Sequence, residues 1–340
     1  MIDTMLSAGI IPDFVIRKGI QNLLKKRLED EYESVFEQNE VKRKQLVQEL
    51  MNSPIAIETD KANDQHYMVP PEFFVKCLGK RLKYSCCHWD KATDLNEAEE
   101  EMLALTVERA QIKDGDKVLE LGHGWGAVTL YMAEKFRNSE ITAVSNSKFQ
   151  GDFIMERAKE RGLDNIRIIT DDVAKFDIDE KFDRVISVEM FEHMRNYKEL
   201  LGNISRWLNP GGTLFVHVFV HKELAYKFEV VDDTDWMSKY FFSGGIMPSE
   251  HLFYYFSDDL KVKEHWRVNG EHYAKTARAW LDNMDKEKDS IIDLFNNHYP
   301  SGEARKWFNY WRIFYMSCEE IWRYRKGREW FVSHYLFEHK

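Results

Sequence analysis

The most informative stretch of this chain runs from Lys117 to Ala127 and reads Lys-Val-Leu-Glu-Leu-Gly-His-Gly-Trp-Gly-Ala. Its first half is a short apolar run, which is typical of a strand buried on both faces. Its second half places Gly122, Gly124 and Gly126 at alternate positions, and helical spacing follows. Glycine lets the backbone bend sharply and approach a ligand. We therefore predict a strand, a glycine turn and a helix that open a nucleotide-binding α/β domain, with Gly122 and Gly124 against the ligand.

Two details of this stretch indicate which nucleotide it binds. The glycine spacing is G-x-G-x-G, not the G-x-G-x-x-G of the dinucleotide-binding fingerprint. An acidic residue, Glu120, stands at the end of the predicted strand, just before Leu121 and Gly122. This combination is typical of methyltransferases that use S-adenosylmethionine (SAM), which has no pyrophosphate to cradle. The alternative is a glycine turn that only packs the helix on the strand.

Apolar strands and helical segments alternate along the middle of the chain, which predicts a mostly parallel sheet. The fold class that we expect is α/β, a class I SAM-methyltransferase Rossmann-like fold with an antiparallel edge. Aromatic segments at 236–242 and 253–256 are expected to roof a pocket. The predicted strands are 118–121, 141–144, 166–169, 184–188, 213–218 (after an Asn209-Pro210-Gly211-Gly212 turn), 261–268 and 330–337.

The chain divides, on this interpretation, into four parts. They are an N-terminal helical extension (1–65), a lid segment over cofactor and substrate (66–110), the SAM-binding core (111–220), and substrate-cap helices with the final strands (221–340). Asp94 is placed to cap a helix at 95–110, with Glu97 in position for a capping box. The N-terminal helices are expected to pack on the main domain or on a partner, so a homodimer is possible.

The composition restricts the partners and the compartment. The 340 residues are 44% hydrophobic, which is ample for a core, and the net charge of −10 argues against nucleic acid or an anionic membrane as partner. The four cysteines contain no C-x-x-C pair, so we expect neither a disulfide framework nor a metal site. No apolar run reaches the ~20 residues of a membrane span, and no signal peptide is recognised. We expect a soluble, cytoplasmic protein that acts on a small molecule.

Polar residues follow the second and third predicted strands, at the edge where open α/β sheets bind ligands. Asn146 follows the second strand and Gln150 lies one helical turn later, and their amides suit the ribose hydroxyls. Asp172 and Val173 follow the third strand, where a carboxylate and a backbone N–H suit adenine. In each case the alternative is a helix cap or turn that stabilises only the backbone.

Glu189, Glu192 and His193 form a second cluster, directly after the fourth predicted strand. At spacings of three and four they would share one side of a helical turn. Methyl transfer from the SAM sulfonium needs a lone pair on the acceptor, and an aliphatic amine with a pKa near ~10 arrives protonated. A carboxylate can attract the ammonium, and a histidine can accept or relay its proton. We predict that these residues catalyse transfer to an amine; the alternative is a solvated helix start.

From about His66 to Lys340 the chain resembles the plant coclaurine N-methyltransferase family, a branch of the cyclopropane fatty acid synthase-like SAM methyltransferases. The resemblance implies N-methylation of an aryl-alkyl amine or benzylisoquinoline-type alkaloid by SAM, which leaves as S-adenosylhomocysteine, with catalysis by Glu189, Glu192 and His193. The segments that carry it include Leu82-Lys83-Tyr84-Ser85-Cys86-Cys87, Val144-Ser145-Asn146-Ser147-Lys148, Glu189-Met190-Phe191-Glu192-His193-Met194, Leu214-Phe215-Val216-His217 and His272-Tyr273-Ala274-Lys275-Thr276. It implies SAM contacts by Tyr84, Ser85, Gly122, Asn146, Gln150, Asp172, Val173 and Val188.

The chain departs from this family at three positions. His123 stands where many relatives have cysteine, and Met68 stands where some have a glutamate facing the amine. Cys318 falls where cyclopropane synthases place a cysteine near their bicarbonate site, and we interpret it as core or pocket lining. Two other functions stay open at this point. One is a lipid-modifying enzyme of the cyclopropane synthase type, and the other is a SAM-binding protein without catalysis.

Overall fold

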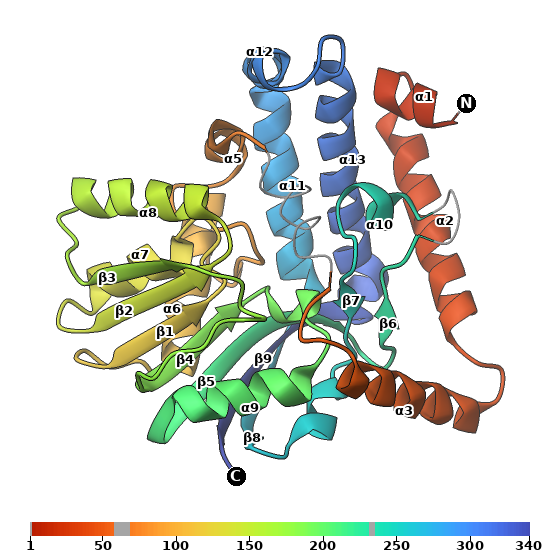
Figure 1. The fold of residues 1–340 in the computed structure, drawn as a ribbon. Coiled ribbons are helices and arrows are strands. Elements are labelled where there is room, and N and C mark those ends of the chain that lie inside the picture. The colour runs from red at the N-terminus through yellow and green to blue at the C-terminus, as the bar shows by residue number, and fades with distance from the viewer. Residues whose placement is uncertain (1, 58–68, 231–234) are drawn as a thin grey trace.

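The computed structural model describes residues 2–57, 69–230 and 235–340 (Figure 1). A small sheet pairs β6 (Tyr226–Lys227) with β7 (Ile246–Met247). The main sheet contains β1 (Lys117–Leu121), β2 (Glu140–Ser145), β3 (Ile166–Thr170), β4 (Phe182–Val188), β5 (Leu208–His221), β8 (Leu260–Val268) and β9 (Trp330–His339). The α-helices are α1 (Ile2–Ala8), α2 (Asp13–Glu31), α3 (Phe36–Asn52), α5 (Pro71–Cys77), α6 (Leu95–Arg109), α7 (Ala127–Lys135), α8 (Lys148–Glu160), α9 (Tyr197–Trp207), α10 (Trp236–Tyr240), α11 (Gly270–Lys286), α12 (Lys288–His298) and α13 (Ala304–Arg323).

The strands of the main sheet lie in the order β3-β2-β1-β4-β5-β9-β8. The first five in this order pair in parallel, whereas β9 is antiparallel to both β5 and β8. The order reverses between β1 and β4, and such a reversal opens a ligand crevice at the carboxyl ends of the strands. All seven predicted strands are confirmed within a few residues, including the late pair at the antiparallel edge.

The predicted turn before the fifth strand takes another form. Phe182 of β4 pairs with Leu208 of β5, but Arg184 pairs with Thr213, so the residues 209–212 bulge out of the ladder. Gly211 has φ +80° inside this bulge, a conformation that glycine adopts without strain. The strand therefore begins earlier than predicted, and the Asn-Pro-Gly-Gly segment interrupts it.

The central strands are buried on both faces, as their apolar sequences require. Val118 of β1 packs with residues of α6, α7 and α8, whereas its neighbours Leu119 and Leu121 pack with residues of α9. This alternation follows from the two-residue period of a strand. The result is three layers, and the third hydrophobic cluster joins α5, α11, α12 and α13 beside them.

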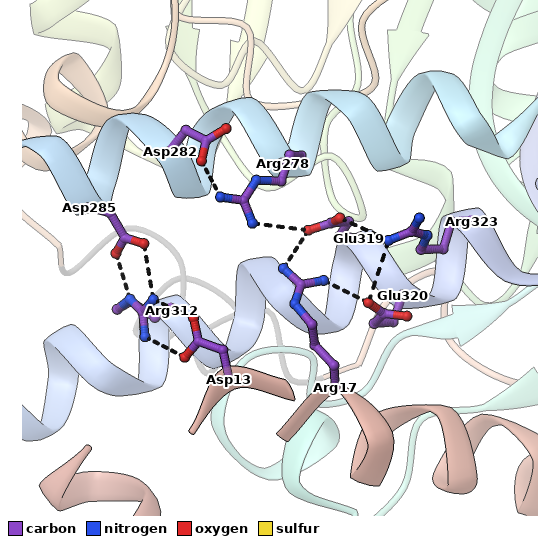
Figure 2. Close-up of polar contacts among 9 residues, drawn as sticks. All are labelled: Asp13, Arg17, Arg278, Asp282, Asp285, Arg312, Glu319, Glu320 and Arg323. Carbon is purple, nitrogen blue, oxygen red and sulfur yellow. Dashed lines mark hydrogen bonds and ion pairs between the residues drawn. The ribbon is translucent and has the colours of Figure 1, made fainter. Parts of the chain in front are cut away.

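The helix α2 is fixed to α13 by ion pairs (Figure 2). Arg17 contacts Glu320 at 2.6 Å and Glu319 at 2.7 Å, and both glutamates are buried to 9% exposure or less. Arg312 of α13 reaches Asp13 at 2.8 Å. Because α13 also carries cavity-lining side chains, the N-terminal helices support one wall of the site described below.

Three further expectations can be compared with the fold. Asp94 caps α6 as predicted, by accepting the Glu97 N–H at 2.9 Å. The aromatic segment at 253–256 does not roof the pocket, because it packs against α9 and β9 beneath the sheet. Across the ranges that the structure describes, no helix has the length and apolar character of a membrane span.

Candidate active site

A cavity lies at the carboxyl ends of β1, β4 and β5, under α11 and α13. Its polar wall is formed by Glu120, His123, Gln150, Glu189, Glu192 and His193. Its aromatic wall is formed by Phe219, Phe242, Tyr273, Trp280, Phe314 and Trp322. Of the two aromatic segments predicted to roof the pocket, only 236–242 does so, through Met237 and Phe242.

The glycine turn forms the floor of this cavity. Gly122, Gly124 and Gly126 have φ of +83°, +48° and +81°, which explains why glycine occupies all three positions. A Cβ on Gly124 would meet no atom within 4 Å, so the backbone there borders open space. A Cβ on Gly126 would lie 2.6 Å from the Ile154 side chain, so this glycine serves the packing of α7 against α8. The turn therefore combines close helix packing with an open backbone edge.

Gln150 presents a buried amide to the same space. Its side chain is fully buried, and neither amide atom has a hydrogen-bond partner among the residues that the structure describes. A buried amide without partners is costly, so a polar ligand is expected to satisfy it. Ser147, not Asn146, caps α8, because its hydroxyl accepts the Gln150 N–H at 3.4 Å. The capping alternative for Asn146 is thus not what this helix uses.

The other predicted cofactor residues divide into two groups. Tyr84, Ser85 and Val188 line the cavity together with the glycine turn and Gln150. Along the described part of the sheet edge, three predicted residues lie outside the cavity wall: Asn146, Asp172 and Val173. The Asp172 carboxylate accepts the Ala174 N–H at 3.0 Å and so stabilises its own turn, which was the alternative interpretation.

Glu189, Glu192 and His193 all reach the cavity, but not from one helical turn. A short 3₁₀-helix spans only Phe191–His193, and Glu189 precedes it with φ +49°. The prediction that the three share one side of a helical turn is therefore wrong. Left-handed backbone is uncommon for a residue with a Cβ, and here it gives Glu189 surroundings different from those of Glu192.

Glu189 is held by three donors. Its Oε1 accepts the Cys86 N–H at 2.8 Å and lies 3.1 Å from His217 Nε2, while its Oε2 accepts the Tyr273 O–H at 2.6 Å. Burial raises the pKa of Glu189 above its ordinary value, and the Lys83 ammonium and the hydrogen bonds from Cys86 and Tyr273 offset only part of this rise. This carboxylate is thus fully hydrogen-bonded within the protein.

Glu192 has the opposite surroundings. It is fully buried, and neither carboxylate oxygen has a hydrogen-bond partner within the described ranges. Burial, and then the nearby charge of Glu189, raise the pKa of Glu192 well above its ordinary value. His193 is half-buried beside it and packs on Phe242 with ring centroids 4.7 Å apart. A carboxyl group so placed favours its protonated form, and a cation bound beside it would stabilise the carboxylate.

Sequence reasoning missed several groups of this site or left their roles unassigned. Lys83 is a buried lysine whose ammonium donates to Ser85 Oγ at 2.5 Å and to the Cys86 carbonyl at 2.7 Å. His217 and Tyr273 appeared only within segments of the family resemblance, and no spacing pattern linked them to Glu189. Cys318 lines the cavity, as predicted, and Met68 lies outside the described residues.

His123, which departs from the family pattern, lies in the cavity wall. The ring lines the cavity, with Nδ1 3.1 Å from the Gly124 carbonyl oxygen. Burial lowers the pKa of His123 to about 4, so the ring is neutral at pH 7. Burial raises the pKa of Glu120 to about 8, against a 2.5 Å hydrogen bond from the Thr129 hydroxyl.

Comparison with known proteins gives consistent matches. Residues 56–327 match the family model described as mycolic acid cyclopropane synthetase. The chain is 41% identical to (S)-coclaurine N-methyltransferase of Thalictrum flavum subsp. glaucum, over 98% of this chain and 94% of that protein. It is 29% identical to cyclopropane-fatty-acyl-phospholipid synthase of Escherichia coli (strain K12), over 79% of this chain and 66% of that protein. A crystal structure of coclaurine N-methyltransferase bound to N-methylheliamine and SAH has a TM-score of 0.96 and 39% identity, covering 99% of this chain and 98% of that one.

Because the family model covers most of its length, this chain belongs to the mycolic acid cyclopropane synthetase family. The predicted fold class and the predicted resemblance to the coclaurine N-methyltransferases are both confirmed. The chain is accordingly a SAM-dependent N-methyltransferase, and SAM is its cofactor.

Proposed function

We propose that this enzyme methylates the nitrogen of an aryl-alkyl amine or a benzylisoquinoline-type alkaloid. The observation that supports this most is Glu192, a buried carboxyl group in an aromatic-walled cavity that has no hydrogen-bond partner among the described residues. Leaving such a charge uncompensated is costly, and an ammonium group would compensate it. Aromatic faces such as that of Trp322 also attract a cation and hold a ring. Relatives named for coclaurine, and a similar structure that holds N-methylheliamine, support an amine of this class.

The residues of the cavity floor fit the cofactor. SAM supplies a methyl group on a sulfonium, which is already activated for displacement. Gly124 would admit its methionine portion along its open backbone edge, with Gly122 beside it, and the Gln150 amide, which has no partner among the described residues, would bond to its ribose. We propose further contacts from Tyr84, Ser85 and Val188 in the wall, and from Asn146, Asp172 and Val173 at the adjoining sheet edge.

The two glutamates and the histidine would then divide the proton chemistry. We propose that Glu192 binds the incoming ammonium and takes its proton, so that the nitrogen presents a lone pair. Glu189 stays anionic under its three donors and makes Glu192 a stronger base through its charge. His193, at the half-buried rim, would pass the proton outward. Positioning of the nitrogen in line with the methyl group supplies the rest of the acceleration.

The test is turnover of a panel of ring-bearing amines with SAM, read as methylated product by mass spectrometry. Glu192→Gln should lower kcat by at least ~100-fold, the usual contribution of a general base, while SAM affinity measured by calorimetry stays within about threefold. Glu250→Gln is the matched control, because Glu250 is equally buried but lies outside the cavity and pairs with Arg267. Near-wild-type turnover by Glu192→Gln would overturn the assigned role.

The same experiment separates the alternative functions. Incubation with labelled SAM and unsaturated phospholipid vesicles would place label in lipid if the enzyme modified acyl chains. Methylated amine with unlabelled lipid supports the proposal. SAM binding without transfer to any amine of the panel or to lipid would overturn the proposed substrate class.

Four organisational features are also proposals. We propose that the parts divided at residues 65, 110 and 220 act as a helical extension, a lid segment, a SAM-binding core and a substrate cap. We propose that the enzyme acts in the cytoplasm without a membrane or nucleic-acid partner, consistent with its net charge of −10.

We propose a homodimer through the N-terminal helices, where Ile10 is 64% and Phe14 75% exposed. Light scattering of the purified protein, with Phe14→Ser as the disrupting variant, tests the dimer.

A further inference from the structure

A row of three hydrogen bonds joins Glu189 to Arg109 through two buried histidines. Glu189 Oε1 lies 3.1 Å from His217 Nε2, His217 Nδ1 lies 2.9 Å from His334 Nε2, and His334 Nδ1 lies 2.8 Å from an Arg109 guanidinium nitrogen. Both rings have no exposed surface. The pairing of β5 with β9 sets His217 directly opposite His334, and Arg109 is the last residue of α6.

The chemistry of arginine gives this row a direction. A guanidinium carries only donors and does not lose its proton in proteins. His334 Nδ1 must therefore accept, which leaves the His334 proton on Nε2. That N–H donates to His217 Nδ1, so the His217 proton is also on Nε2, where it donates to Glu189. Each ring is assigned as the neutral Nε2–H tautomer, and the assignment starts at Arg109.

The consequence appears at Glu189, where every hydrogen bond described for the carboxylate runs toward it. The Cys86 N–H can only donate, and the directed row makes His217 a donor as well, while Tyr273 supplies an O–H. A protonated carboxyl group would need an acceptor, which neither Cys86 nor His217 offers, so only the Tyr273 hydroxyl could accept its proton and the other two contacts favour the anion. We propose that Arg109 is a positioning residue, which acts through His334 and His217 to hold Glu189 as an oriented anion beside Glu192. This inference rests on the proposed function, because it concerns the same pair of glutamates.

The other groups that act on this row reinforce its direction. The positive charge of Lys83 acts on Glu189 and on both histidines, and burial with these positive neighbours lowers the pKa of both histidines well below the ordinary value. Both rings are therefore neutral at physiological pH. Among the described residues, the titratable groups around the row are Lys83, Cys86, Cys87, His88, Glu108, Glu192, Tyr273 and Cys318.

The row is closed to protons at its outer end. A proton passed from Glu189 toward Arg109 would need an acceptor there, and a guanidinium has none. The substrate proton must therefore leave by the other side, past Glu192 and His193. The row stabilises the charge of Glu189 and does not transfer protons.

The experiment compares Arg109→Met, which removes the donor and its charge, with Arg109→Lys, which keeps both. Without Arg109 the tautomers of His334 and His217 are no longer fixed, so His217 can stop donating to Glu189 and the pKa of Glu189 rises. The acidic limb of kcat/KM against pH should therefore move up by about half a unit or more in Arg109→Met. Arg109→Lys should stay within about 0.2 unit of wild type. Arg184→Met is the control, because Arg184 is a comparably buried arginine that donates to the Gln111 carbonyl at 2.9 Å, near the start of β4.

A spectroscopic readout makes the test independent of turnover. Side-chain ¹⁵N spectra of histidine-labelled protein, assigned with His217→Gln and His334→Gln, should show two neutral Nε2–H rings between pH 6 and 8 that change in Arg109→Met. An Nδ1–H tautomer or titration of either ring in that range would overturn the inference. The inference would also be overturned if the acidic limb of kcat/KM against pH were the same in wild type and Arg109→Met. Failure of the wild type to methylate any amine would instead overturn the proposed function and leave the tautomer result to decide this inference.

Discussion

Glu99 anchors the loop that leads to Tyr84 in the cavity wall. This fully buried carboxylate accepts the backbone N–H groups of Gly79 at 3.0 Å, Arg81 at 2.8 Å and Lys83 at 3.1 Å. Glu99→Ala leaves these donors without their acceptor, and about 1 kcal/mol for each gives a loss of about 3 kcal/mol in the free energy of unfolding. The loop would then shift, and we expect SAM affinity to fall about tenfold.

Glu99→Gln separates the shape of this anchor from its charge. Glutamine keeps one oxygen for Gly79 and Lys83 but turns its NH₂ toward the Arg81 N–H, a loss of about 1 kcal/mol. Burial raises the pKa of Glu99 from 4.5 to about 7. The folded state therefore holds this proton more tightly than the unfolded state. The stability from this group is complete below pH 4.5 and is lost as the pH rises through 7.

In Glu99→Gln, the lost hydrogen bond to Arg81 lowers stability at every pH, whereas removal of the ionisable group raises stability only at high pH. Between pH 5.5 and 8.5 the wild type should lose roughly 2 kcal/mol through this linkage, which Glu99→Gln cannot lose because it does not ionise. Glu99→Gln should therefore be about 1 kcal/mol less stable than wild type at pH 5.5 and about as much more stable at pH 8.5. Urea unfolding at both pH values measures this. Glu100→Gln, next along α6 with a half-exposed side chain, is the control.

A difference in unfolding free energy between wild type and Glu99→Gln that stays constant across this pH range would refute the reasoning. Unchanged SAM affinity in Glu99→Ala would refute the link from this anchor to the cavity wall.

Two further substitutions test the cofactor floor. Gln150→Leu should raise the free energy of unfolding by about 1 kcal/mol, because it removes a buried amide that has no partner among the described residues. The same variant should bind SAM about tenfold more weakly or worse, as measured by calorimetry. Weaker binding without a rise in unfolding free energy would mean that the amide has a partner in the folded state. Gly124→Ala and Gly162→Ala place a Cβ at similar φ values, +48° and +60°, with no atom within 4 Å in either case. Both should cost about 1 kcal/mol in thermal or urea unfolding, but only Gly124→Ala should lower SAM affinity; equal affinities would place SAM away from Gly124.

The sequence predicted the sheet well because its strands carry their own signal. Val118 to Leu121 is apolar at nearly every position, as a strand covered on both faces must be, and glycine positions follow from the backbone that they allow. The last strand, β9, is also buried along most of its length, whereas the edge strand β8 is buried only at Leu260 and Val268 and does not follow this rule. The start of β5 was missed because Asn209-Pro210-Gly211-Gly212 reads as a turn whether it precedes a strand or bulges from one.

The site was less accessible to prediction, since its contacts depend on register rather than spacing. His217 meets His334 only because β5 pairs with β9, and 117 positions separate them in sequence. The left-handed backbone of Glu189 has no sequence signature, so the expected helical turn was the wrong geometry. The identities of Glu189, Glu192 and His193 were nevertheless recognisable, because acids and a histidine directly after a buried strand are poorly explained by packing.

The contrast between Glu189 and Glu192 carries the mechanism that we propose. Two carboxyl groups three residues apart differ in their hydrogen bonds: the first receives three donors, and the second receives none within the described structure. Environments that push two pKa values apart are how a fold assigns different roles to like groups. On this proposal the donors of Glu189 keep its charge and orientation, and that charge raises the pKa of Glu192. The histidine row ends at an arginine that cannot accept a proton, so the proton taken from the amine must leave past His193. His193→Ala should therefore slow turnover without changing the free energy of unfolding, because the hydrogen bonds of the row remain in place.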